Sequence, residues 1–310
     1  MSRPPGATVG GQAVIEGVMM RGPKGWSVAV RRPDGIIEAR SDELPRLSAR
    51  SRAAKVPMIR GVMVMAESLS LGFRALSWSA TKATGEDEEE IKPRHIAGAM
   101  VVAFVFFVGF FMLLPLLIAR GAERVLGESA VVFNVIDGLV RVLLFVGYIW
   151  AIGRSAEIAR VFMYHGAEHK TIHAYEAGDP LSVDAIQKYS RRHPRCGTNF
   201  LLIVILIAIV VFTIVGRPGW FWLVASRVLL LPVIAGFSYE VLKLASDHRW
   251  MSVASRPGIW LQRLTTREPT DDQVEVAIAS LLAAFDEDER ADVERRGPIA
   301  PGALGFVVSG

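Results

Sequence analysis

The chain has 310 residues, of which 51% are hydrophobic and 21% are charged, and its mean hydropathy is +0.34. A soluble domain of this length rarely contains so much apolar sequence, and the apolar residues here gather in long runs separated by charged stretches. The composition therefore excludes an ordinary soluble globular protein. A single cysteine, Cys196, excludes an internal disulfide framework and fits a reducing compartment.

Residues 1–47 are expected to form a small cytoplasmic β unit. Two segments rich in β-branched and apolar residues flank Pro-Asp-Gly at 33–35, a sequence that favours a turn between strands. The glycine-rich segment 10–23 precedes them and is not followed by the Gly-Lys-Ser/Thr of a phosphate loop. We therefore predict a glycine-punctuated strand in this segment, in preference to a phosphate site.

The second region, residues 48–94, is expected to contain an amphipathic helix and an acidic linker. Residues 53–80 carry apolar side chains at helical spacing on one face. Basic residues lead into this helix, which suits contact with an anionic membrane surface; the alternative is packing against other cytoplasmic parts. The acidic stretch 85–90 is predicted to be a solvated linker without a function of its own.

Four apolar runs between residues 95 and 245 predict about four transmembrane helices, because a bilayer core about 30 Å thick needs about 20 apolar helical residues. The first and third runs contain no Asp, Glu, Lys or Arg. The second and fourth contain charges that cost about 3 kcal/mol each at mid-membrane, so a buried or interfacial helix is their alternative. The runs extend over 95–119, 131–153, 198–216 and 220–237.

The second run contains both an acidic and a basic residue. Asp137 and Arg141 are four positions apart, so they share a helix face and can form an ion pair that offsets part of the insertion cost. Charges within a membrane often mark function. A structural pair that holds helices together is an equally good interpretation of these two residues.

The connections between the runs alternate between many and few basic residues. Basic residues are numerous in the segment before the first run, in the loop 154–197 and in the tail. The connection after the first run has only Arg120 and Arg124 as basic residues, and the connection after the third run has only Arg217. The positive-inside rule then places both termini and the long loop in the cytoplasm of a multi-pass membrane protein. Residues 1–11 lack the apolar core of a signal peptide, so we expect the first run to act as its own insertion signal.

Chemistry-bearing residues concentrate in the loop between the second and third runs. His165, His169 and His173 follow one another at intervals of four, and each such step advances about 40° around a helix. They therefore lie on one stripe, which Glu176 joins. Imidazole and carboxylate groups on one face suit a divalent metal, with zinc as the first choice. The alternative is polar surface or a hydrogen-bond network without metal.

His165-x-x-Glu168-His169 also has the order of the inverted zincin motif. In that motif the two histidines bind zinc and the glutamate acts as general base toward a metal-bound water, so Glu168 is the candidate catalytic residue. A metal that only joins the loop to the helix ends is the non-catalytic alternative. The remaining ligand is expected from His173, from Glu240 at the cytoplasmic end of the fourth run, or from Glu16.

A second polar segment, 191–199, lies directly before the third run. His193 and Cys196 have ligand-like spacing, and a cysteine among arginines just before a helix favours the thiolate. A basic anchor for lipid headgroups is an equally good interpretation. The further polar site candidates are Glu176, His193, Arg195, Cys196 and His248.

The C-terminal part is predicted to contain one more cytoplasmic helix. Thr270 is placed to cap a helix whose apolar residues share one side, which indicates a packing or partner helix within a segment 246–292. Residues 293–310 are expected to be disordered. The fold expected overall is a mainly α integral membrane protein with a small N-terminal β unit and cytoplasmic helices.

Four segments of this chain resemble the YqhQ-like bacterial membrane family. The resemblance extends from about residue 8 to residue 285. This family is described as a domain of unknown function and is often labelled a predicted metal-dependent enzyme of the bacterial inner membrane, so the resemblance implies metal dependence and names no substrate. The segments are GGQAVIEGVMMRGP at 10–23, HGAEHK at 165–170, HPRCGT at 193–198 and SYE at 238–240.

The function expected is that of a cytoplasm-facing, metal-dependent membrane enzyme, with hydrolysis as the reaction class. The alternative from another class is a non-catalytic membrane scaffold or assembly factor whose polar motifs bind partners or lipid. A transporter is less favoured, because the runs contain few charged residues. Membrane lipid, including anionic headgroups, is the expected partner, and no nucleic acid is expected.

Overall fold

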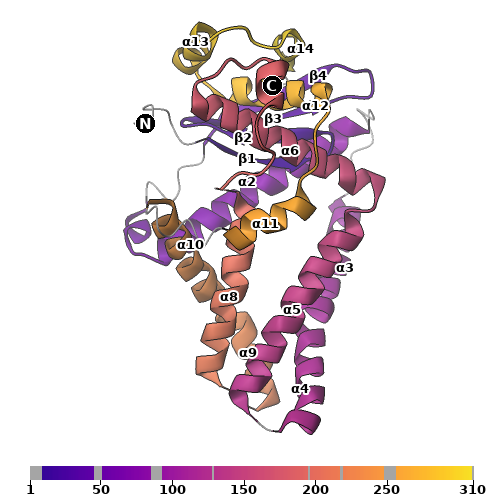
Figure 1. Ribbon diagram of the computed structural model, residues 1–310, viewed down its shortest axis with the longest axis vertical. Coiled ribbons are helices and arrows are strands. Elements are labelled where there is room, and N and C mark those ends of the chain that lie inside the picture. Colours follow the sequence, from indigo (N-terminus) through magenta and orange to yellow (C-terminus); the bar gives the residue numbers. More distant parts are fainter. Residues whose placement is uncertain are drawn as a thin grey trace.

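The computed structural model describes residues 9–44, 51–84, 93–127, 129–194, 196–216, 219–247 and 256–308. Most of these residues are helical, and a small sheet is formed near the N-terminus, as predicted. An upper part contains the sheet and the helices that cover it, and long helices extend from it to form a lower part (Figure 1).

The upper part is organised by a five-stranded sheet in the order β1-β2-β3-β4-β5. The first four strands form an antiparallel meander, and the last strand pairs in parallel with β4. The predicted β unit is thus confirmed, and the glycine-rich segment forms two strands joined by a tight turn. The strands are β1 (Gly10–Val14), β2 (Gly17–Arg21), β3 (Gly25–Arg31), β4 (Ile37–Glu43) and β5 (Val307–Val308).

Alternation along the strands buries both faces of the sheet. Val18 and Met20 belong to the core shared with α6 (Ala156–Ala177) and α12 (Asp271–Ala284). Met19, between them in sequence, belongs to the core on the other face. Because successive strand residues point to opposite faces, one short apolar strand supplies both cores. The sheet is therefore the middle layer of three.

The other face of the sheet is covered by α2 (Ile59–Ala83), which follows the short helix η1 (Arg52–Lys55). Leu71 and Ala75 of α2 are buried against the sheet. Toward its start, α2 packs against α10 (Leu231–Asp247), where Gly61 permits close contact with the backbone of Gly236. The predicted helix is thus present, but the apolar face expected from the spacing, with Val62, Leu69 and Phe73, is exposed, and a different face packs against the rest of the chain.

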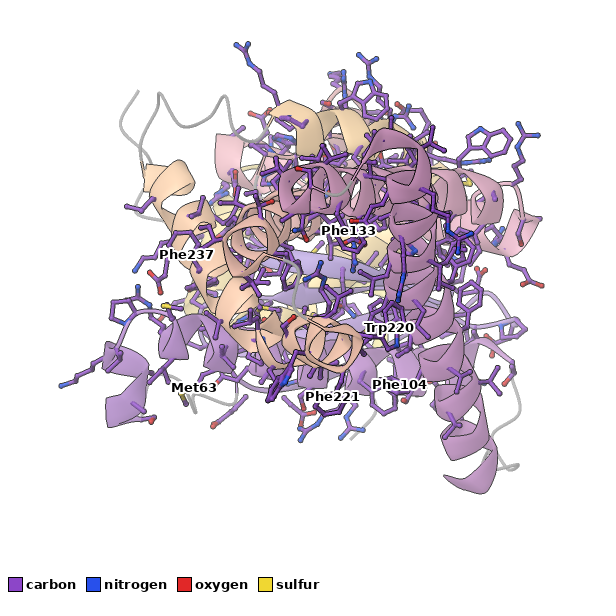
Figure 2. The ribbon with its side chains drawn as sticks, turned by 90° about the horizontal axis from the view of Figure 1, so that it is seen from below. Met63, Phe104, Phe133, Trp220, Phe221 and Phe237 are labelled. Carbon is purple, nitrogen blue, oxygen red and sulfur yellow. The ribbon has the colours of Figure 1, made fainter. Side chains whose placement is uncertain are left out.

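The lower part is built from the four apolar runs, all of which form helices. Leucine, valine and phenylalanine side chains cover much of its outer surface. Among the residues labelled in the view from below, Phe104, Trp220, Phe221 and Phe237 are exposed (Figure 2). The helices are α3 (Pro93–Phe107), η2 (Val108–Leu113), α4 (Leu114–Leu126), α5 (Ala130–Ile152), α8 (Gly197–Val215), α9 (Trp220–Leu229) and α10.

Within the described residues, length and apolar content identify two helical segments that could cross a membrane, Val101–Leu126 and Ala130–Ile152. The α9–α10 pair adds a third if a bend of 43° is accepted within one span. Pro232 lies just after this bend and cannot donate a backbone hydrogen bond, which accounts for the break. The apolar stretch Phe200–Val215 of α8 is shorter, so the structure identifies two or three candidate spans where four were expected.

The predicted pairing of Asp137 and Arg141 is confirmed, with Arg141 Nη2 donating to Asp137 Oδ1 at 3.0 Å. The structure adds a second helix to this group. Arg227 of α9 is buried, and its Nη2 donates to Asn134 Oδ1 at 2.8 Å and to Asp137 Oδ2 at 3.4 Å. The one carboxylate, Asp137, is therefore shared by two arginines, one from its own helix and one from α9.

The C-terminal part returns to the sheet. Thr270 and Gln273 form the capping box of α12, as the predicted helix start requires, and α12 is buried against the sheet and α6. The expectation that residues 293–310 are disordered is wrong for 293–308. Val293, Ala300 and Ala303 dock on the core, and Ala300 N donates to Leu181 O at 3.0 Å. The additional helices are α7 (Val183–Gln187), α11 (Arg256–Thr265), α13 (Glu287–Arg295) and α14 (Pro301–Leu304).

Candidate metal centre

The histidine stripe lies on α6, a helix that runs through the core of the upper part. Residues on every side of its middle turns are buried, because α12 and β1 pack against it. The ring centroids of His165 and His169 are 4.4 Å apart, which confirms that the two residues share one face. His169 is buried, and His165 is partly buried.

Cys196 joins these two histidines. It is the residue that precedes α8, so it lies where the upper part meets the apolar helices. One potential ligand atom from each of His165, His169 and Cys196 lies within 4.8 Å of the other two, and Cys196 Sγ is 3.3 Å from His165 Nε2. In the sequence, Cys196 has ligand-like spacing with His193 alone and stands among the further polar candidates; the structure makes it the third member of the cluster with His165 and His169.

Backbone carbonyls fix which nitrogen each histidine presents to the cluster. His165 Nδ1–H donates to Thr265 O at 2.8 Å, and His169 Nδ1–H donates to Arg191 O at 2.7 Å. A carbonyl oxygen can only accept, so the Nδ1 atoms carry the protons and the Nε2 atoms of the neutral rings keep a lone pair. Metal-binding histidines are usually held in this way by a partner on the other nitrogen.

Burial favours the same protonation state. His169 Nε2 is buried and has no hydrogen-bond partner among the described residues. Burial lowers the pKa of His169, because the protonated, charged ring would be poorly solvated in this buried position. Thr198 Oγ1 donates to Cys196 Sγ at 3.4 Å. The cluster therefore brings two imidazoles and one sulfur together.

Glu168 lies beside the stripe, as the helical offset predicts. Its carboxyl oxygen Oε2 is 3.9 Å from His165 Nε2, and the side chain is almost entirely buried. Burial raises the pKa of Glu168, and the nearby His165 and His193 act in the opposite direction. A Cβ atom at Gly11 of β1 would lie 3.0 Å from Glu168 Cγ, so the glycine-rich strand leaves the space that this side chain occupies.

His173 and His193 extend the row of imidazoles but are not part of the three-residue cluster. His173 Nε2–H donates to Arg192 O at 3.0 Å. The buried His193 ring lies 4.5 Å from that of His173 and 5.7 Å from that of His169. His193 Nε2 is 3.5 Å from Glu176 Oε2. Burial lowers the pKa of His193.

The two carboxylates proposed to complete the metal shell are engaged by arginines. Glu240 Oε2 accepts from Arg60 Nη2 at 2.5 Å. Glu16 Oε1 accepts from Arg160 Nε at 2.7 Å, and Glu16 Oε2 accepts from Tyr164 Oη at 3.3 Å. Neither glutamate belongs to the cluster of His165, His169 and Cys196. Arg195 and His248 lie outside the described residues.

The segment that carries Cys196 is held in place by α11. The side-chain amide of Gln262 forms two hydrogen bonds with the backbone of His193: His193 N donates to Gln262 Oε1 at 2.8 Å, and Gln262 Nε2 donates to His193 O at 2.9 Å. Gln262 is completely buried. Since the end of α11 also supplies the carbonyl of Thr265, this helix positions both sides of the cluster.

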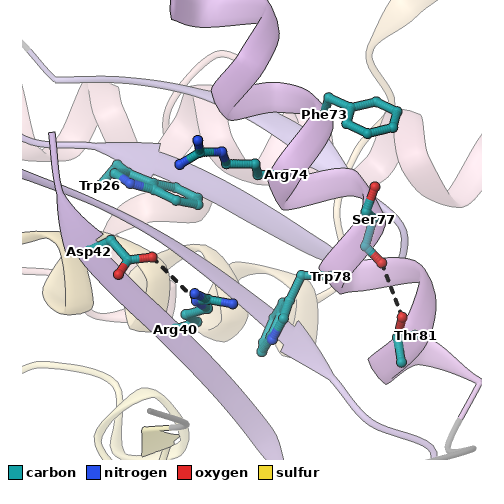
Figure 3. A pocket seen from close by; sticks show the side chains of 8 residues that line it. All are labelled: Trp26, Arg40, Asp42, Phe73, Arg74, Ser77, Trp78 and Thr81. Carbon is teal, nitrogen blue, oxygen red and sulfur yellow. Dashed lines mark hydrogen bonds and ion pairs between the residues drawn. The ribbon is translucent and has the colours of Figure 1, made fainter. Parts of the chain in front are cut away.

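A separate cavity of about 530 Å³ lies between the sheet and α2 (Figure 3). Trp26 and Trp78 form part of its wall, and Arg40 Nε donates to Asp42 Oδ2 at 3.3 Å along it. None of the three cluster residues lines this cavity. It is therefore a different feature from the candidate metal centre.

Substitution of Gly166 tests the close contact between α6 and the segment after α11. A Cβ atom at this position would lie 2.1 Å from Arg267 O, a backbone atom that cannot move without shifting the segment after α11. We expect Gly166→Ala to destabilise the fold by about 1–3 kcal/mol, measured as a lower thermal unfolding midpoint. Gly147→Ala is the matched control, because a Cβ atom at this helical glycine meets nothing within 4 Å. Equal thermal unfolding midpoints for the two variants would contradict the close contact between Gly166 and Arg267.

Comparison with known proteins places this chain in a family. The model of the family described as "Protein of unknown function (DUF1385)" matches residues 56–287. "Uncharacterized protein YqhQ" of Bacillus subtilis (strain 168) is 36% identical over 289 residues, which cover 87% of this chain and 90% of that protein. No solved structure matches. The resemblance predicted from the sequence motifs is thus confirmed, and the chain belongs to the DUF1385 family and is similar to the YqhQ protein.

Proposed function

We propose that this chain is a metal-dependent membrane enzyme in which His165, His169 and Cys196 hold a zinc ion and Glu168 acts as general base in a hydrolysis. The observation that carries the proposal is the convergence of two histidine rings with one sulfur, while the Nδ1 atoms of both rings donate to backbone carbonyls.

The ligand set supports zinc over other divalent ions. Imidazole and thiolate are the ligands that zinc prefers, whereas magnesium and calcium prefer oxygen. Bonds of about 2.0 Å to nitrogen and about 2.3 Å to sulfur in a tetrahedral site separate these two ligand atoms by about 3.5 Å. The 3.3 Å between His165 Nε2 and Cys196 Sγ is close to that separation.

The reaction class follows from three protein ligands and a neighbouring carboxylate. Zinc held by His165, His169 and Cys196 would supply Lewis-acid activation of water at neutral pH. Glu168 Oε2, near His165, is positioned to accept a proton from the nucleophile and to return it to the leaving group. Burial of Glu168 keeps bulk water away from this carboxylate. These roles support hydrolysis as the reaction.

We further propose that the lower helices cross the cell membrane and that both termini and the metal centre are cytoplasmic. The long apolar helices and the apolar side chains on their outer surface support this orientation, together with the basic loop 154–197. Four crossings result if α8 and the bent α9–α10 pair are each counted as one span. The metal centre then lies where α8 leaves the membrane.

A non-catalytic scaffold is the second candidate, and one observation favours it. The three cluster residues come from α6 and from the segment before α8, so a zinc ion here would also join the upper part to the apolar helices. In that case the ion would be structural and Glu168 would not be needed as a base. The predictions below separate the two candidates.

The first prediction concerns metal content. Purified in detergent, the wild-type chain is expected to hold one equivalent of zinc by mass spectrometry of the metal. Removal of any one cluster ligand, by His165→Ala, His169→Ala or Cys196→Ser, should lower the zinc content at least about tenfold. His173→Ala is the matched control and should retain zinc, because its ring lies outside the cluster. Full zinc content in His165→Ala would contradict the site.

The second prediction separates catalysis from scaffolding. Glu168→Gln keeps the size and polarity of the side chain but removes the base, so it should abolish complementation of a deletion strain while leaving zinc content and membrane insertion intact. Glu157→Gln, at an exposed position on the same helix, is the control and should complement fully. If Glu168→Gln complements and His165→Ala does not, the metal is structural and the enzyme proposal fails.

The third prediction concerns topology. Reporter fusions at Gly127, between the first two runs, and at Gly178, at the end of α6, should report opposite sides of the membrane, with Gly178 cytoplasmic. An even number of crossings between these sites would place both reporters on the same side. That result would overturn the proposed orientation of the metal centre.

A further inference from the structure

A basic cavity lies beside the candidate metal centre. It is open to the surface and has a volume of about 360 Å³, within the usual range for small-molecule sites of roughly 300–1,000 Å³. One backbone carbonyl connects it to the metal centre, because Arg191 O accepts the hydrogen bond of the cluster residue His169; the neighbouring Arg192 O accepts from His173, outside the cluster. The residues that line it are Ser190, Arg191, Arg192, Arg263 and Glu268.

The cavity carries an excess of positive charge. Three arginines and one glutamate line it, which gives a net charge of 3 − 1 = +2. Even this one carboxylate is neutralised from outside the cavity, since Glu268 Oε2 is 2.7 Å from Nζ of the buried Lys170. Glu268 Oε1 also lies 3.5 Å from Arg191 Nε. Arg192 and Arg263 have no carboxylate partner within the described part of the chain.

We propose that this cavity binds a phosphate group of the substrate, an inference that rests on the proposed function and names its substrate class. The excess of positive charge favours a phosphate dianion over a singly charged carboxylate. The planar guanidinium groups of Arg192 and Arg263 suit bidentate contacts with phosphate oxygens. The hydroxyl of Ser190 provides a further hydrogen-bond donor at the cavity wall.

The cavity and the metal centre share one short piece of backbone, so a bound phosphate would fix the substrate relative to the metal. Arg191 and Arg192 contribute side chains to the cavity and carbonyls to the histidines. Replacing an arginine side chain leaves its carbonyl in place, so phosphate binding can be weakened without disturbing the ligands. The phosphate can belong to a lipid headgroup or to a soluble phosphomonoester.

The test uses the zinc-loaded full chain in dodecyl maltoside micelles, titrated with inorganic phosphate in a calorimeter. The double variant Arg192→Gln/Arg263→Gln is expected to bind phosphate about tenfold or more weakly than the wild type, at unchanged zinc content. Arg295→Gln is the matched control, because Arg295 is exposed and pairs with Asp292 on α13. Equal phosphate affinities of the wild type and the double variant, or no binding to the wild type, would overturn the proposal.

Two further probes identify the source of the phosphate. If dioctanoyl phosphatidic acid binds more tightly than glycerol 3-phosphate, and this binding is lost in the double variant, the phosphate belongs to a lipid headgroup. The reverse order of affinities assigns a soluble phosphomonoester.

His165→Ala separates this proposal from the proposed function. If that variant retains both zinc and arginine-dependent phosphate binding, the metal site fails and the phosphate site stands. If it loses zinc and the double variant still binds phosphate normally, only the phosphate site fails.

Discussion

The candidate centre depends on the hydrogen bonds from two histidine Nδ1 atoms to backbone carbonyls. His165 is bound to the end of α11 through Thr265, and His169 is bound to the segment before α8 through Arg191. Each bond both orients a ring and selects the neutral tautomer whose Nε2 faces Cys196. Because a buried imidazolium would be costly, burial and the carbonyls favour the same state. Without these bonds the rings could rotate, and the cluster would lose its geometry.

The same contacts join the two parts of the molecule. Helix α6 belongs to the core under the sheet, whereas Cys196 begins a helix of the lower part. Gln262 clamps the connecting backbone, so the centre lies at a rigid junction. Lower down, Asp137 contacts arginines from two helices. Such contacts offset part of the cost of burying charged groups between elements.

Periodicity accounts for what the sequence predicted correctly. The spacing of His165, His169 and His173 defines a stripe on any helix, and the strand alternation around Pro-Asp-Gly defines a hairpin. Long-range partners carry no such signal. Arg60 and Arg160 engage Glu240 and Glu16, and Cys196 reaches the stripe through an irregular segment that no periodic rule describes. The ordered tail was missed because Val293 and Ala300 dock on a core that exists only after folding.

The most direct test of the metal centre is X-ray absorption spectroscopy of the zinc-loaded chain. Two imidazoles and one thiolate predict one sulfur at about 2.3 Å and two histidine nitrogens at about 2.0 Å, with a light atom completing the shell. The Cys196→Ser variant should lose the sulfur scatterer selectively. A bound zinc ion that shows only nitrogen and oxygen neighbours in the wild-type chain would contradict the centre assigned to His165, His169 and Cys196.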